Sequence, residues 1–137
     1  TRLILSGVLD DFSDLTFVIS HKGGGIAAMK ERLEVHFGST EAPVTKQTFA
    51  RNRLPFDQCF HKLYFNLAGH QGGMASVRCA LTGISPQRLL FGTDYPQNFR
   101  GAPLMIKTYI GNIKKLDLDA ASKEAILGGN GRQLLGL

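Results

Sequence analysis

Three continuous apolar runs, each of five or six residues, constrain the fold of this chain most strongly. They are residues 15–20 (LTFVIS), 63–68 (LYFNLA) and 88–92 (RLLFG). A strand with one face in water alternates apolar and polar residues, whereas a strand covered on both faces, as in a parallel sheet, is apolar throughout. The sequence therefore predicts three parallel strands that are buried on both faces.

Segments with helical patterns separate these runs. The clearest is 26–37, where Ile26, Met29, Leu33 and Phe37 recur at helical spacing among charged residues. The other expected helices are 2–11, 55–62, 72–81, 101–115 and 119–128, with a last turn at 130–136. Asp119 is the expected N-cap of the helix over 119–128. The polar stretch 38–55 is expected to be a loop, and 12–14 a turn.

The resulting order, α-β-α-β-α-β-α, predicts parallel strands joined by crossover helices in one α/β domain over 1–137. A length of 137 residues, with 43% apolar and 20% charged residues, suits a single globular domain. The opening residues look like the middle of a helix, so we expect the chain to begin inside a larger protein.

Composition also bounds the partners. The net charge of +5 is scattered along the chain, so we expect no nucleic-acid partner. No apolar stretch is long enough for a membrane helix, and we expect no signal peptide because the opening residues lack a basic segment followed by an apolar core. Cys59 and Cys79 lack metal-ligand spacing and fall in expected helices, so buried free thiols in a cytoplasmic protein are expected.

Parallel α/β folds carry their chemistry at the carboxyl ends of the strands. The residues at those ends are His21, the segment from Asn66 to Gly69, and Asp94. A histidine and an aspartate that meet there can supply an acid–base group and a metal ligand. Two alternatives stay open from sequence: His21 as a satisfied core residue, and Asp94 as a turn or helix-cap residue.

The glycines after His21 allow two interpretations. Residues 23–28 (GGGIAA) fit the loose dinucleotide-binding pattern G-x-G-x-x-A between a strand and a helix. His21 and Lys22 separate the strand from the first glycine, and the next strand comes too late for that motif. The alternative is that the glycines keep the wall beside His21 free of side chains, so that a substrate can approach.

Taken together, three segments resemble a known family. VISHKGGG with Arg32 eleven residues after His21, RLLFGTDYP, and the closing ILGGNGRQLLGL resemble the amidohydrolase-related TIM barrels. The most similar branch contains aminocarboxymuconate semialdehyde decarboxylase and the hydroxybenzoate-type decarboxylases. The resemblance implies a (β/α)8 barrel, of which this chain is the C-terminal part, about strands six to eight with helices five to eight.

The resemblance also implies roles for particular residues. Asp94 matches the family's ligand for one divalent metal ion, which is zinc or alternatively manganese. His21 matches the acid–base residue near the metal, and Arg32 matches an arginine that reaches a substrate carboxylate across a subunit interface. Gly23, Gly24 and Asn66 are expected to line the substrate site. The implied activity is metal-dependent decarboxylation or hydrolysis of a carboxylated aromatic or dienoic small molecule.

The sequence departs from the family in several places. Lys22 stands where a small residue or histidine is usual, and Asn66 stands where an aspartate is common. The H-x-H pair of the first strand and the fifth-strand histidine are absent; His36 and His61 fall on expected helices, and His70 follows the second apolar run. A complete barrel has roughly 250 residues.

We therefore expect this polypeptide alone to bind metal weakly and to show little activity. A homo-oligomer or a missing N-terminal half would complete the site. The alternatives are a non-catalytic, self-associating remnant of such a barrel and a nucleotide-binding α/β module.

Overall fold

The structure, a computed structural model, describes residues 1–37, 51–68, 73–96 and 102–137. Its elements in chain order are α1 (Arg2–Leu5), α2 (Val8–Asp11), β1 (Val18–Ile19), η1 (His21–Gly25), α3 (Ile26–Phe37), α4 (Phe56–His61), β2 (Tyr64–Asn66), α5 (Gly73–Gly83), η3 (Pro86–Arg88), β3 (Leu89–Leu90), α6 (Ala102–Lys114), α7 (Ala120–Glu124), η4 (Ala125–Gly129) and α8 (Asn130–Leu135). The expected alternation of helices and strands is confirmed, and 38–50 of the expected loop lies outside the described residues.

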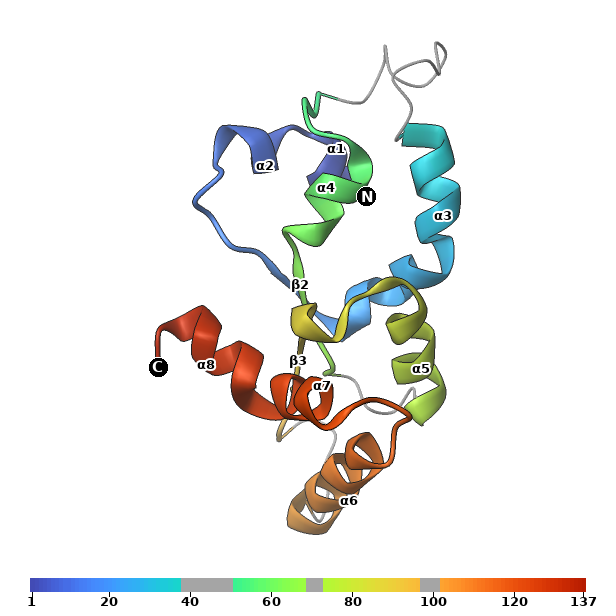
Figure 1. Ribbon diagram of the computed structural model, residues 1–137, viewed down its shortest axis with the longest axis vertical. Coiled ribbons are helices and arrows are strands. Elements are labelled where there is room, and N and C mark those ends of the chain that lie inside the picture. Colours follow the sequence, from blue (N-terminus) through green and yellow to red (C-terminus); the bar gives the residue numbers. More distant parts are fainter. Residues whose placement is uncertain (38–50, 69–72, 97–101) are drawn as a thin grey trace.

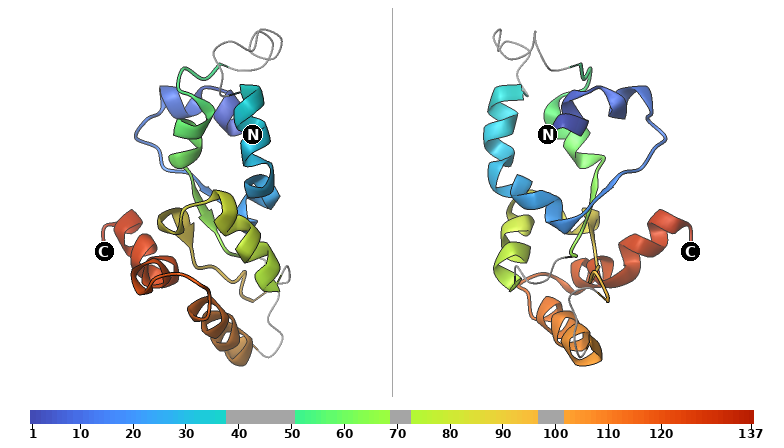
Figure 2. Two further views of the ribbon diagram at one scale, coloured as in Figure 1. Left: turned by 45° about the vertical axis from the view of Figure 1, so that its right-hand side comes forward. Right: turned by 180° about the vertical axis from the view of Figure 1, so that it is seen from behind.

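The strands form one parallel sheet in the order β1-β2-β3. The paired residues are Val18 with Tyr64, Ile19 with Phe65, Phe65 with Leu89, and Asn66 with Leu90. Figure 1 shows the strands running from the group formed by α1, α2 and α4 toward α6. In both views of Figure 2, α3 and α5 lie together on one side of the strands and α8 lies on the other. The predicted parallel sheet is confirmed, with shorter strands than the apolar runs.

The strands of the sheet differ in how deeply their side chains are buried. Phe65 and Leu89 are almost fully buried, as predicted for a strand covered by helices. In contrast, Val18 is 43% exposed and Leu15 is 57% exposed. The prediction of burial on both faces is therefore wrong for β1. Both β1 and β3 are edge strands, but among the described residues β1 pairs with β2 alone, whereas the C-terminal segment also bonds to β3.

The expected helix over 2–11 is also wrong as one element, because it breaks at Gly7. This residue has a φ of 80°, in the left-handed region that favours glycine. A Cβ here would lie 3.0 Å from the carbonyl oxygen of Arg51, whose own N–H donates to the Leu5 carbonyl. The incoming chain at Arg51 therefore occupies the space that a continuous helix with a side chain would need.

The outer edge of β3 is closed by the C-terminal segment. The buried Asn130 side chain donates through Nδ2 to the carbonyls of Leu89, at 2.7 Å, and Pro86, at 2.8 Å. The Phe91 N–H donates to the Ile126 carbonyl at 2.9 Å. The bonds to the Leu89 carbonyl and from the Phe91 N–H satisfy groups on the outer side of β3, which β2 does not reach. The sequence predicted the turn that begins at Asn130 but not this contact.

The C-terminal helices follow the prediction closely at α6 and less closely afterward. The expected N-cap is confirmed, since Asp119 accepts from the Ser122 N–H at 2.8 Å. The expected helix over 119–128 instead ends at Glu124 and continues as the wider turn η4, in which Gly128 departs from helical geometry. This turn carries the Ile126 carbonyl to β3.

Tyr109 joins α6 to the end of β2. Its hydroxyl donates to the Leu67 carbonyl at 2.9 Å, and its ring lies 5.5 Å from that of Phe91. Burial raises the pKa of Tyr109 to about 12. Helix α6 is thereby attached to the carboxyl ends of β2 and β3.

Side chains on the helices meet the remaining expectations in part. Cys59 is a buried free thiol, as predicted, whereas the free thiol of Cys79 is only half-buried. The side chain of His61 is 53% exposed, and its Nδ1 lies 3.2 Å from Asp57 Oδ1. The same carboxylate oxygen lies 2.7 Å from Nζ of Lys30 in α3. Within the described ranges, no helix has the length and apolarity to span a membrane.

Replacing Asn130 by alanine tests the closure of the β3 edge. The change removes the Asn130 donor from the Leu89 carbonyl, while the Pro86 carbonyl still accepts from the Leu89 N–H. We therefore expect a loss of about 1–3 kcal/mol in the free energy of unfolding. Urea unfolding followed by circular dichroism measures it. Gln133→Ala, at an exposed position of the same helix, is the control and should change stability by less than about 0.5 kcal/mol. An equal loss in both variants would contradict the assigned role.

The phenol of Tyr109 predicts a defined alkaline transition. Its folded pKa lies above its unfolded value, so its contribution to stability is complete below about pH 10 and is lost as pH rises through about 12. The free energy of unfolding is measured between pH 8 and 12 for the wild type and for Tyr109→Phe. The difference between the two proteins isolates the contribution of the Tyr109 hydroxyl from that of other titrating groups. The stability difference between them should shrink over that range; a constant difference would argue against the buried hydroxyl bond.

Candidate active site

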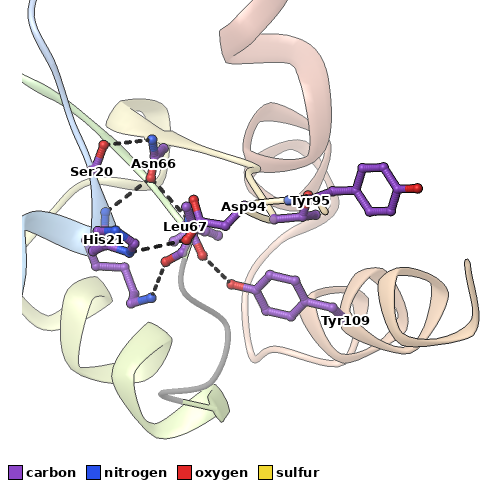
Figure 3. A network of polar contacts seen from close by, with 10 residues as sticks. Ser20, His21, Asn66, Leu67, Asp94, Tyr95 and Tyr109 are labelled. Carbon is purple, nitrogen blue, oxygen red and sulfur yellow. Dashed lines mark hydrogen bonds and ion pairs between the residues drawn. The ribbon is translucent and has the colours of Figure 1, made fainter. Parts of the chain in front are cut away.

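The carboxyl ends of β1 and β3 bring together the two residues that the sequence singled out. His21 Nδ1 lies 3.6 Å from Asp94 Oδ2, although 73 positions separate them in the chain. Their side chains are 58% and 26% exposed, respectively, so both can be reached from solvent. Figure 3 shows the imidazole and the carboxylate facing each other across the end of β2. The expected meeting of a histidine and an aspartate at the strand ends is present.

Backbone strain is concentrated at the same place. His21, Lys22 and Asp94 have φ values of 54°, 57° and 58°, and they are the non-glycine residues with positive φ in the described part of the chain. This left-handed conformation is uncommon for residues with a side chain, and it persists where surrounding contacts enforce it. Such strain clusters at functional sites, which makes this junction of strand ends the strongest candidate.

Asn66 at the end of β2 holds the backbone of this junction. Its Oδ1 accepts from the N–H groups of His21 and Ala68, both at 3.2 Å, and its Nδ2 donates to Ser20 Oγ at 3.4 Å. The amide thus bonds to the segment that presents the imidazole. Its expected role in substrate binding stays a prediction, and its structural role is to fix the neighbouring turn.

Lys22 belongs to the site although sequence reasoning noted it only as a departure from the family. Lys22 is only 7% exposed, and its Nζ donates to the Ala68 carbonyl at 2.8 Å. Burial lowers the pKa of Lys22, while the charge of Asp94 raises it. No local pattern signals a buried lysine, because the residue follows an apolar run in the manner of any exposed turn residue.

The glycines beside His21 have different surroundings. A cavity of about 220 Å³ lies between η1 and α5, and it is lined by His21, Lys22, Gly24, Gly25, Ala27, Ser76, Cys79 and Ala80. Gly24 has open space where a Cβ would be, in keeping with the expected wall free of side chains. A Cβ on Gly23 would instead lie 2.9 Å from the Phe65 ring. Gly23 therefore packs against the sheet, and it offers a dinucleotide no open surface on that side.

Arg32 is not brought to this junction within the chain. It lies at an exposed position of α3, and its expected contact with a carboxylate would come from a subunit interface. His70 lies outside the described residues. His36 is exposed on α3, and His61 lies on α4, which precedes β2 and is thus beyond the opposite end of the strands.

The described residues supply only part of a metal site. The His21 imidazole and the Asp94 carboxylate are the ligand types that zinc or manganese accepts. Across 1–37, 51–68, 73–96 and 102–137, no group of three or more His, Cys, Asp or Glu side chains could hold a metal ion. Catalytic zinc sites use three protein ligands. These residues therefore do not form a complete metal centre.

Comparison with known proteins gives a consistent result. The sequence model of the family described as Amidohydrolase matches residues 1–137. Similar solved structures include a 2,6-dihydroxybenzoate decarboxylase in complex with 2,6-dihydroxybenzoate, with 23% identity and a TM-score of 0.76. The 5-carboxyvanillate decarboxylase of Sphingomonas paucimobilis has 22% identity and a TM-score of 0.76. A dihydroxybenzoic acid decarboxylase from Polaromonas sp. JS666, with bound manganese and 2-nitroresorcinol, has 21% identity and a TM-score of 0.76.

These alignments each cover 99% of this chain but 39%, 38% and 38% of the solved chains, in the same order. No curated protein matched the sequence. The solved relatives are TIM-barrel amidohydrolases, so the fold observed here corresponds to part of such a barrel.

Two adjacent glycines give a matched test of the packing at η1. Alanine at position 23 would have a positive φ and would also clash with Ile26 at 2.7 Å and with Phe65. Alanine at position 24 would have a positive φ of 62° in open space. We expect Gly24→Ala to lower the free energy of unfolding by about 1 kcal/mol and Gly23→Ala by at least about 2 kcal/mol more. Denaturant unfolding of the pair measures the difference, and equal losses would refute the close packing on Phe65.

Proposed function

The chain belongs to the amidohydrolase family, and on that premise we propose that it is the C-terminal part of a metal-dependent decarboxylase of a hydroxylated aromatic carboxylic acid. The observation that carries the proposal is the approach of His21 to Asp94 at the carboxyl ends of parallel strands. The solved structures with this fold include decarboxylases of 2,6-dihydroxybenzoate and 5-carboxyvanillate. In this proposal β1, β2 and β3 are strands six, seven and eight of the barrel.

Decarboxylation of an aromatic acid requires a proton at the ring carbon that bears the carboxyl group. The carbon–carbon bond then breaks, its electron pair returns to the ring and carbon dioxide leaves. We assign the proton transfer to the His21 imidazole. Nδ1 is turned toward Asp94, so Nε2 is the nitrogen that faces substrate. A positioned histidine contributes roughly 10²–10⁴-fold to such a step.

Asp94 is proposed as one ligand of a divalent metal ion, manganese or zinc. Such an ion supplies Lewis acidity, which favours negative charge on a bound oxygen. Because the described residues do not complete the centre, the remaining ligands would come from polypeptide beyond them. The proposed substrate contacts are the backbone of Gly23 and Gly24, of which Gly24 has the open space, together with Asn66. Arg32 from a neighbouring subunit is proposed as a further contact, which would make the intact enzyme an oligomer.

The decisive experiment uses the native protein rather than an isolated segment. Its intact mass and metal content should show a polypeptide longer than 137 residues with about one divalent ion each. A metal-free polypeptide of this length would support the alternative, a non-catalytic remnant that self-associates through the exposed edge of β1. Protection from thermal unfolding by NAD or ATP, without metal, would instead support nucleotide binding.

Substitutions then test the assigned roles. With 2,6-dihydroxybenzoate or 5-carboxyvanillate as substrate, His21→Asn and Asp94→Asn should each lower kcat at least about 100-fold. Metal analysis should separate them, because Asp94→Asn loses the ion and His21→Asn retains it. His61→Asn, at an exposed histidine beyond the other end of the strands, is the control and should keep activity. Full activity of His21→Asn would remove the acid–base role.

A further inference from the structure

Lys22 occupies the point where all three strand ends meet. It follows His21 directly at the end of β1, and its Nζ donates to the Ala68 carbonyl just after β2, at 2.8 Å. The charge of Asp94, after β3, acts on the same ammonium group. Figure 3 shows the end of β2, where Asn66 and Leu67 lie between His21 and Asp94. One side chain therefore contacts or faces each part of the candidate site.

The burial of this lysine is unusual enough to need a reason. Lysine is among the residues that are almost never fully buried unless paired, and this one is 7% exposed. An ammonium group taken out of water is strongly unfavourable without a partner. Lys62, which precedes the other end of β2, also donates to a backbone carbonyl, that of Leu9 at 3.2 Å, but it remains half-buried. The buried Lys22 side chain thus links the residues that follow β1 to those that follow β2.

The backbone at Lys22 shows what the contact holds in place. His21 and Lys22 are consecutive residues with positive φ, each unfavourable by roughly 1–2 kcal/mol for an L-residue with a side chain. Two bonds from β2 secure this turn: the His21 N–H donates to Asn66 Oδ1, and Lys22 Nζ donates to the Ala68 carbonyl. Without the second bond, the turn can relax toward ordinary φ values. Because the imidazole is attached to the same turn, it would move away from Asp94.

We propose that Lys22 is a positioning residue whose buried ammonium group, bonded to the Ala68 carbonyl, holds the strained turn that keeps the His21 imidazole opposite Asp94. The inference deepens the proposed function, on which it rests only for the importance of His21 and Asp94 in the reaction. The geometric claim stands by itself and can be tested without a substrate.

Three substitutions separate the side chain from the backbone. Lys22→Met removes the donor and the charge at similar length, and Lys22→Arg keeps both. Lys22→Gly removes the side chain but adopts positive φ without strain. If the only role of Lys22 were to adopt a positive φ, Lys22→Gly would leave the imidazole signals of His21 as they are in the wild type. Lys62→Met is the matched control, because it removes a similar lysine–carbonyl bond away from the site.

The measurement is the imidazole ¹⁵N spectrum of the native protein labelled at histidine, recorded at one pH. The His21 signals are assigned by their loss in His21→Asn, and the signals of His61 serve as an internal reference. We expect Lys22→Met and Lys22→Gly to shift or broaden the His21 signals and Lys22→Arg to return them toward wild type. The glycine variant should be more stable than the methionine variant, and Lys62→Met should leave His21 unchanged.

Wild-type His21 signals in Lys22→Gly or in a folded Lys22→Met would overturn the proposal. If Lys22→Met does not fold, the glycine and arginine variants still decide it. Failure of the proposed function is a separate result, since an enzyme without decarboxylase activity can still show the spectral change. Where activity is present, Lys22→Met should lower kcat more than it raises KM, because the substrate contacts remain while the acid–base group is misplaced.

Discussion

Parallel pairing of three short strands is the constraint on which the rest of this structure depends. Parallel strands end at the same side of a sheet, so residues far apart in sequence meet there without any contact elsewhere in the chain. This shared edge brings His21 and Asp94 together, and the bonds of Asn66 and Lys22 secure the turn that carries His21. The helices contribute by covering Phe65 and Leu89 and by attaching to the strand ends, as Tyr109 does.

Much of the architecture was predictable because it follows from local patterns. Apolar continuity located the strands, and helical spacing located α3 to its ends. The failures have physical causes that a pattern does not contain. The break at Gly7 depends on the approach of Arg51. The exposure of Val18, in contrast to the buried Leu89, goes with an edge strand to which the C-terminal segment does not bond. Such facts are set by the tertiary arrangement, whereas propensity is a local quantity.

The candidate site was predictable at the level of residue type and strand end, but its internal supports were not. His21 and Asp94 follow apolar runs, and that position is visible in the sequence. The bonds that hold them come from Asn66 and Lys22, and each crosses more than forty positions of the chain. A lysine after a strand is ordinarily exposed, so its burial could be found only with the sheet assembled.

The two edges of the sheet have a consequence for assembly. Open edges on both sides would let copies add without limit, as strands do in fibrils. Here the groups at the β3 edge are occupied by Asn130 and Ile126, whereas β1 pairs with β2 alone in the part of the chain that the structure describes. The C-terminal turn thus closes one of the two sides on which further strands could be added to this sheet.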